Sequence, residues 1–172
     1  GGNLGGCLLT ETRDLPPGDY TLELLLPGGA QTLGDVTILP LARAMAPPVF
    51  SHAPDVTFGN LIALPGFSLD PDPPLPGQPV TLTLNWQSLA PTDSDYSVFV
   101  HFLNPDGSIA AQSDSRPRKG DYPTYLWLPG EYVSDSYSFT LNSGPYSLET
   151  GFYLPDTGTR LGAGTIYTLT IP

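Results

Sequence analysis

The clearest pattern along the chain is a strict alternation of apolar and polar residues in short runs. The run over residues 79–87 turns polar side chains to one face and, to the other, Val80, Leu82, Leu84 and Trp86. This two-residue period is typical of an antiparallel strand with one face in a core and the other in water. The sequence therefore predicts a half-buried strand over 79–87.

A second run, residues 95–103, is apolar on both faces, which is expected of a strand at the centre of a sheet with both sides covered. The turn sequence Asn104-Pro105-Asp106-Gly107 follows it directly. The alternation continues beyond this turn, and a further stretch precedes both runs. The remaining predicted strands are 108–113, 131–141, 145–154, 165–171 and, as one long or broken strand, 55–69.

About seven strands, separated by Pro and Gly turns and with no segment of helical period between them, are typical of two packed antiparallel sheets. A parallel α/β fold needs crossover segments of about a dozen residues or more, and this pattern offers none. The sequence therefore predicts an all-β fold, an immunoglobulin-like two-sheet antiparallel sandwich, over residues 55–172.

An internal repeat indicates how the rest of the chain is organised. Residues 18–23 (GDYTLE) match residues 144–149 (GPYSLE) at an offset of 126. Leu33-Gly34 and the run after it align with Leu161-Gly162 and the run that ends at Pro172, which gives a period of about 127 residues. The chain is thus expected to hold one complete module and the terminal strands of another.

On this division, residues 1–40 are the last two or three strands of a module and residues 41–54 are a semi-rigid Pro-rich linker. A fragment of about 40 residues cannot bury a core of its own. Its apolar face needs a cover, either because the chain is cut from a longer tandem array or because the strands complete a sandwich in another molecule. The residues predicted to make this contact are Leu22, Leu24, Leu26, Val36 and Ile38.

Charge and cysteine content limit the classes of function and partner that are expected. Six Lys and Arg against 17 Asp and Glu give a net charge of −11, which disfavours a nucleic-acid partner. No run reaches the about 20 apolar residues that span a bilayer, and no signal-peptide pattern is visible. The single cysteine, Cys7, excludes an internal disulfide. Leu4–Cys7 is weakly similar to a lipoprotein processing site, and the alternative is a buried or unreactive thiol.

Five stretches within residues 66–160 carry a family resemblance: LPGQPVTLTLNW (75–86), DYSVFVH (95–101), YPT (122–124), WLPGE (127–131) and YSLETGFY (146–153). They resemble a β-sandwich module that occurs outside the membrane in bacterial mannosyltransferase-type membrane glycosyltransferases and in large surface proteins. The resemblance implies an extracytoplasmic location and an accessory role. It implies no transferase activity, because the catalytic membrane portion of such enzymes does not match this chain.

Catalytic chemistry has little support in the sequence. Neither His52 nor His101 belongs to a nucleophile, metalloprotease or phosphate-loop motif, and His101, between apolar neighbours, is expected to be a hydrogen-bonded structural residue. Asp70 and Asp72 could hold a cation such as Ca²⁺, but two ligands are far fewer than the about six it takes, so a solvated turn is favoured. We therefore expect no enzymatic activity, no metal site and no cofactor.

Two clusters are candidate binding residues. Arg116, Arg118 and Lys119 hold three of the six basic residues in one loop, which could dock on the acidic surface of an adjacent copy or could simply be solvated. Four aromatic residues could stack on sugars, or could cap the end of the sandwich, as the resemblance favours for two of them. These aromatic residues are Tyr122, Tyr125, Trp127 and Tyr132.

The functional expectation is a non-catalytic structural module at the cell surface or outside the cell. It would associate with copies of itself or with adjacent modules, in a tandem surface protein or a filament. The alternatives are a carbohydrate-binding module, with polysaccharide as the partner, and an accessory domain of a surface glycosyltransferase. Trp86 and Tyr146 are assigned to the core, and Tyr146 is a candidate corner tyrosine whose hydroxyl ties a turn.

Overall fold

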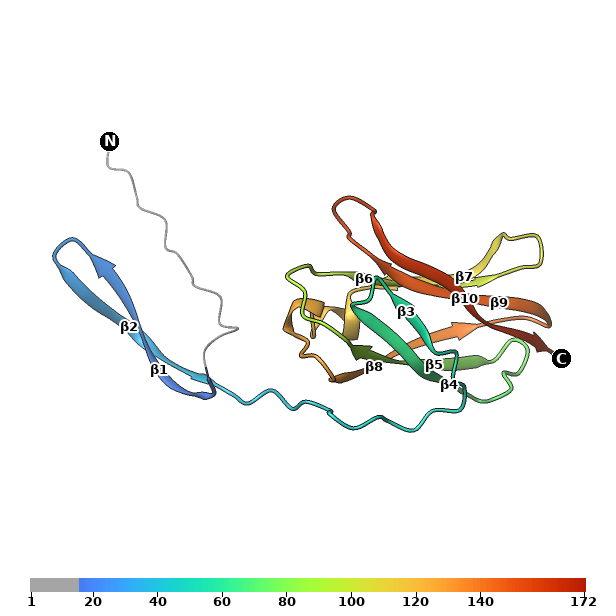
Figure 1. The fold of residues 1–172 in the computed structure, drawn as a ribbon, viewed down its shortest axis with the longest axis horizontal. Helices are drawn as coiled ribbons and strands as arrows, with labels where there is room; N and C mark the ends of the chain where they lie inside the picture. Colours follow the sequence, from blue (N-terminus) through green and yellow to red (C-terminus); the bar gives the residue numbers. More distant parts are fainter. Residues whose placement is uncertain (1–15) are drawn as a thin grey trace. The chain divides into compact units, whose positions relative to one another are not determined.

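In the computed structural model, which describes residues 16–172, the chain divides into two compact units, Gly1–Ala42 and Arg43–Pro172. Residues 1–15, and with them Cys7, lie outside the described part. The described part of the first unit is a hairpin of β1 (Gly18–Leu26) and β2 (Gly29–Ile38) (Figure 1). The second unit consists of β3 (Val56–Phe58), β4 (Ile62–Asp70), β5 (Pro79–Ser88), β6 (Ser97–Leu103), β7 (Ile109–Ser115), the short 3₁₀ helices η2 (Pro117–Gly120) and η3 (Thr124–Leu126), β8 (Tyr132–Thr140), β9 (Gly144–Tyr153) and β10 (Arg160–Ile171).

The second unit is a sandwich of two four-stranded antiparallel sheets. One sheet has the order β3-β4-β5-β8 and the other has the order β10-β9-β6-β7. The predicted fold class, an all-β antiparallel two-sheet sandwich preceded by two further strands, is confirmed. Between residues 16 and 172, no helix combines the length and the apolar character needed to cross a membrane.

The stretch predicted as one long or broken strand before the sandwich is broken. A turn at Gly59 and Asn60, both with positive φ, separates β3 from β4. Gly59 also lies against the far sheet, because a Cβ at this position would come within 2.2 Å of Leu161 Cδ1. The dipeptide Gly59-Asn60 is itself a turn signal in the sequence, and four consecutive apolar residues follow it.

The core lies between the two sheets and is formed by alternate residues of the strands. Trp86 of β5 and Phe152 of β9 meet edge to face with ring centroids 4.7 Å apart, and both are fully buried. Burial of each large apolar side chain contributes about 1.5–3 kcal/mol. The predicted corner tyrosine is also confirmed, since the Tyr146 hydroxyl donates to the Asn142 carbonyl at 3.2 Å.

Most of the segment predicted to be a linker is attached to the sandwich. Tyr132 donates its backbone N–H to the Ala44 carbonyl at 2.8 Å, and Phe67 donates to the His52 carbonyl at 2.9 Å. The ring of Phe50 covers Gly66 so closely that a Cβ there would lie 2.1 Å from it. Residues 43–54 therefore pack along the first sheet, because they carry apolar and backbone groups that this sheet can satisfy.

Candidate functional site

The β1–β2 hairpin gathers most of its large apolar side chains on one face, and Leu25, 80% exposed, lies on the other. Strand alternation and cross-strand pairing place Leu22, Leu24 and Leu26 of β1 on the same face as Val36 and Ile38 of β2. Within the hairpin these side chains stay open to solvent, with Leu22, Val36 and Leu26 exposed at 45, 47 and 49%. We call this set of five residues the hairpin face.

The opposite face of the hairpin pairs its polar groups internally. Thr37 donates its hydroxyl to Asp19 at 2.6 Å, and Thr21 donates to Asp35 at 3.0 Å. These cross-strand hydrogen bonds suit a surface that remains in water. The hairpin face is therefore the side that needs a partner, as the sequence predicts, while two strands alone are too few to supply one.

A second candidate site lies on the outer face of the β10-β9-β6-β7 sheet. The Arg160 guanidinium lies over the ring of Phe99, 4.4 Å from its centroid, and 3.7 Å from the Glu149 carboxylate. His101 lies between two carboxylates, 3.5 Å from Asp114 and 4.0 Å from Glu149. Four strands thus bring cationic, anionic and aromatic groups together at one place.

A shallow hollow of about 200 Å³ opens among these side chains. Gly151 lies opposite Phe99 in the β6–β9 pairing, where neighbouring atoms already fill the space of a side chain. A Cβ on Gly151 would lie 2.1 Å from the Gly162 carbonyl oxygen and 2.8 Å from the Phe99 ring. We call this feature the outer hollow; its lining residues are Phe99, His101, Asp114, Tyr153, Gly158 and Arg160.

Tyr153 adds a hydroxyl to the outer hollow. It donates to the Asp114 carboxylate at 3.4 Å. Burial, and then the charge of Asp114, raise the pKa of Tyr153. Its hydroxyl therefore remains protonated as a donor, beside carboxylates that only accept and a guanidinium that only donates. Such a mixture of donors and acceptors suits a ligand rich in hydroxyl groups, although the hollow is smaller than the about 300 Å³ of typical enclosed ligand pockets.

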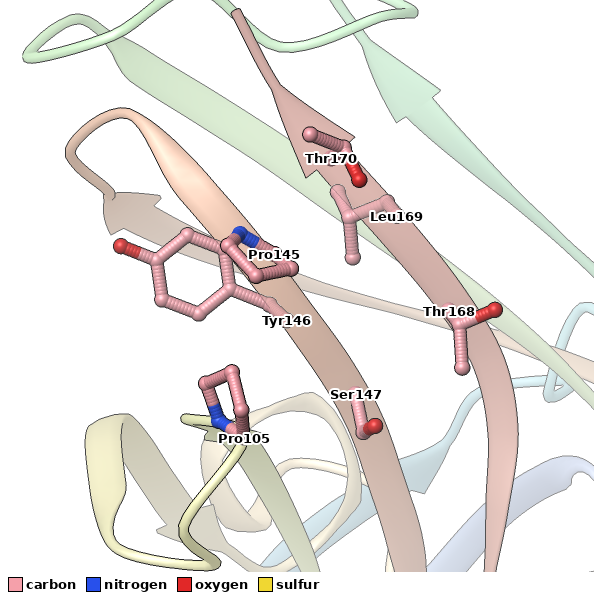
Figure 2. Close-up of a pocket in the computed structure, with 7 residues that line it drawn as sticks. All are labelled: Pro105, Pro145, Tyr146, Ser147, Thr168, Leu169 and Thr170. Atoms are coloured by element: carbon pink, nitrogen blue, oxygen red, sulfur yellow. The ribbon is translucent and has the colours of Figure 1, made fainter.

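A third concave region lies where the β6–β7 turn meets the ends of β9 and β10 (Figure 2). It has a volume of about 280 Å³. Pro105 comes from the turn, and the strands contribute Pro145, Tyr146, Ser147, Thr168, Leu169 and Thr170. None of these side chains is charged, so the groove has no acid or base to activate its hydroxyls, and we assign it no chemistry.

The predicted docking loop is engaged with the sandwich at two of its three basic residues. Arg116 pairs with Asp95 at 2.6 Å. Arg118 donates its backbone N–H to Asp135 and lies over the Tyr122 ring at 5.4 Å. Lys119 is exposed and lines a hollow of about 380 Å³, together with Thr81, Ser113, Ser115, Ser136, Tyr137 and Ser138. Arg116 and Arg118 are held by these contacts but stay exposed, and Lys119 is the basic residue of the loop that lines this hollow.

The structure separates the four predicted aromatic residues. Tyr122 and Trp127 are 3% exposed and belong to the core, where Trp127 donates its indole N–H to the Tyr122 carbonyl. They cannot present a ring face to a sugar, because that face is already packed. Burial and the adjacent Glu131 raise the pKa of Tyr122. Tyr125 and Tyr132 are half-buried, so the cluster caps the end of the sandwich.

Of the remaining titratable groups noted in the sequence, His52 and Asp72 form a pair. His52 contacts Asp72 at 2.7 Å and stacks on Phe67 with ring centroids 4.7 Å apart. Asp72 is thus engaged by a histidine. Among residues 16–172, no group of three or more His, Cys, Asp or Glu side chains is arranged to hold a metal ion.

Comparison with known proteins adds information about the fold only. No protein-family model matches the chain, and no curated protein matches it. Among solved structures, the C-terminal domain of Wzt superposes with a TM-score of 0.55 at 14% sequence identity, over 67% of this chain and 76% of that one. The chain is similar in fold to this domain. At such low identity the likeness supports a β-sandwich module and carries no activity or partner with it.

The outer hollow was missed by reasoning from sequence. Its residues lie on four different strands, and each of them is unremarkable in its own segment. One signal was present, since Phe99 and His101 are alternate residues of a strand predicted to be covered on both sides. What covers Phe99 on the outer side is not a second layer but the side chain of Arg160.

Proposed function

We propose that this chain is part of a non-catalytic structural protein at the cell surface or outside the cell, in which β-sandwich modules neighbour one another and strands of a neighbouring module cover the hairpin face. The observation that supports the proposal is the hairpin face itself. It places five apolar side chains, three of them 45–49% exposed, on one face of a two-stranded unit, and an isolated hairpin of this kind is at best marginally stable in water. A protein that keeps such a surface has an occupant for it.

Electron microscopy of native material labelled with an antibody against this chain tests the proposal. We expect label at regular spacing on a surface layer or on filaments, because modules that associate through a shared surface form an ordered array. Preabsorbing the antibody with the purified chain should remove the label. Diffuse label throughout the cytoplasm would contradict the proposal.

Carbohydrate binding is a second candidate function, and the outer hollow favours it. A guanidinium, two carboxylates and a tyrosine hydroxyl surround an aromatic ring within one depression. Attachment to a mannosyltransferase-type enzyme, where such a site would hold a glycan, has no support of its own in the structure. Sequencing the gene of the parent protein would test whether this chain is attached to such an enzyme.

Arg160→Gln tests the second candidate. If the outer hollow binds sugars, this change should weaken retention in gels containing mannan, dextran or an acidic polysaccharide by about tenfold, since it removes about 1.4 kcal/mol of charge-assisted hydrogen bonding. The thermal midpoint should stay within a few degrees. Arg116→Gln, at an exposed arginine outside the hollow, is the matched control and should leave retention unchanged. If no gel retains the wild-type chain, the candidate fails.

A further inference from the structure

The hairpin β1–β2 begins in the same way as the last hairpin of the sandwich, β9–β10. Each first strand opens with a glycine, Gly18 or Gly144, two residues before a tyrosine. The hydroxyl of Tyr20 donates to the carbonyl four residues earlier, at 2.7 Å, and Tyr146 makes the equivalent bond at 3.2 Å. Both hairpins therefore start with the same corner tyrosine.

The two hairpins also share their register. The pairs Gly18↔Ile38 and Gly144↔Ile171 open them, and four rungs later Leu22↔Gly34 matches Leu148↔Tyr167. After that rung, each second strand contains one extra residue, a β-bulge at the same place. Bulges depend on local twist and pairing, so an identical position in two hairpins indicates a common architecture.

This register corrects the alignment made from sequence. Leu33 corresponds to Ile166, at the bulge, and not to Leu161. The reason is that β1 and β2 join through a short turn, with Leu26 paired to Gly29, whereas β9 and β10 continue to a longer tip. With the corrected register, seven of thirteen aligned positions are identical, namely the pairs 18/144, 20/146, 22/148, 23/149, 32/165, 37/170 and 38/171.

The equivalent positions differ in burial. Leu148 and Ile171 are at most 1% exposed, in the core beneath the β3-β4-β5-β8 sheet. Leu22, the counterpart of Leu148, is 45% exposed. One edge of β9 is paired with β6, while β1 pairs only with β2 among the described strands. The hairpin face thus corresponds to the surface that β9–β10 buries in its sandwich. In β1–β2, this surface lacks the neighbouring strands that cover it in the sandwich.

We infer that β1–β2 is the closing hairpin of a second sandwich with this same architecture, whose other strands precede the hairpin in a longer polypeptide. The inference rests on the proposed function and names the partner. Chain order supports this source, because β9–β10 follows β3–β8 within its own module. The complete sandwich of this chain, or of a copy, is not the occupant, because β9–β10 already fills the closing position. In the second sandwich, a strand like β6 pairs with the open edge of β1.

A graft within the full chain tests this equivalence. Residues 18–23 and 32–38 replace residues 144–149 and 165–171 without any change in length. The graft needs six substitutions: Pro145→Asp, Ser147→Thr, Ile166→Leu, Tyr167→Gly, Thr168→Asp and Leu169→Val. We expect cooperative unfolding to survive, with a midpoint lowered by about 10–15 °C, mainly because the Tyr167 ring contacts to His52 and Phe67 are lost.

The control graft carries the same thirteen residues shifted by one position, which turns the apolar side chains outward. It should lose the cooperative transition and the near-UV circular dichroism of the core. An unfolded first graft would overturn the inference, and so would two grafts of equal stability, because the identity of the inward face would then not matter.

The other occupants are tested with Leu22→Asp in the ungrafted chain. We expect its unfolding midpoint to stay within about 2 °C of wild type, whereas Leu148→Asp abolishes cooperative unfolding. A comparable loss with Leu22→Asp would show that the hairpin packs on its own sandwich. A wild-type dimer in sedimentation that Leu22→Asp dissociates would show that a second copy is the partner. Either result overturns the inference, while failed surface labelling alone would overturn only the proposed function.

Discussion

Replacing Trp127 by alanine should unfold a large fraction of the protein instead of removing a binding residue. The indole is 3% exposed, meets Phe152 edge to face with centroids 6.4 Å apart and donates a hydrogen bond to the Tyr122 carbonyl at 3.1 Å. Deleting a buried tryptophan costs about 3–5 kcal/mol, through lost burial and the cavity left behind. Since domains of this size are stable by only about 5–15 kcal/mol, the loss is severe.

Guanidinium unfolding followed by circular dichroism measures this effect. Leu128→Ala is the matched control, because Leu128 is the next residue and is 47% exposed; it should change the free energy of unfolding by no more than about 0.5 kcal/mol. A Trp127→Ala variant that keeps wild-type stability but loses retention by polysaccharide would restore the sugar-stacking interpretation of this residue.

Arg43→Met should cost about 3 kcal/mol of unfolding free energy, although the residue lies in a segment that the sequence marks as a linker. One guanidinium nitrogen, Nη1, shares its two N–H groups among three acceptors: the Glu131 carboxylate at 2.5 Å, the Tyr122 hydroxyl oxygen at 2.7 Å and the Leu126 carbonyl at 2.9 Å. Glu131 is 1% exposed and Arg43 is 26% exposed. Removing the cation leaves a buried carboxylate without a counter-charge, which typically costs about 3–5 kcal/mol. The partial exposure of Arg43 places the loss at the lower end.

The double variant Arg43→Met/Glu131→Gln separates charge from packing. It should recover more than half of the loss, because the neutral amide needs no counter-charge. Its carbonyl oxygen can accept from the Leu128 N–H, and its NH2 group can donate to the Tyr122 hydroxyl oxygen, in place of the two bonds that Glu131 accepts. Urea unfolding of the four members of this cycle gives the coupling energy. A single Arg43→Met variant as stable as wild type would mean that residue 43 is not anchored to the sandwich in solution.

The strands of the sandwich could be predicted from the sequence because each is encoded locally. The alternation of Val80, Leu82, Leu84 and Trp86 requires one buried face, and β5 buries that face. The segment predicted over residues 95–103 became the central strand β6, paired with both β7 and β9. Turn residues with positive φ, such as Gly107, separate these strands as expected. Such signals act over a few residues and need no knowledge of the partner strand.

The contacts of individual side chains were harder to predict from the sequence, because they join residues that are distant along the chain. Arg43 and Glu131 are 88 residues apart and form a buried ion pair. Tyr122 and Trp127 are of the residue types that stack on sugars in binding sites, but both side chains are buried in the core. The outer hollow brings together side chains of β6, β7, β9 and β10 that are distant along the chain. No single stretch of sequence indicates that these residues come together in the fold.

The amino-acid sequence by itself determined that this chain is an all-β sandwich with a repeated terminal hairpin, since alternation, turn residues and the GDYTLE and GPYSLE repeat are properties of neighbouring residues. Only the tertiary structure decided which hairpin is buried and which is open. Leu22 and Leu148 are the same residue type at the same rung, and they differ because strands far away in the chain cover one of them. Whether an apolar side chain is buried depends on the surface that packs against it. Its hydrophobicity shows only that burial is favourable.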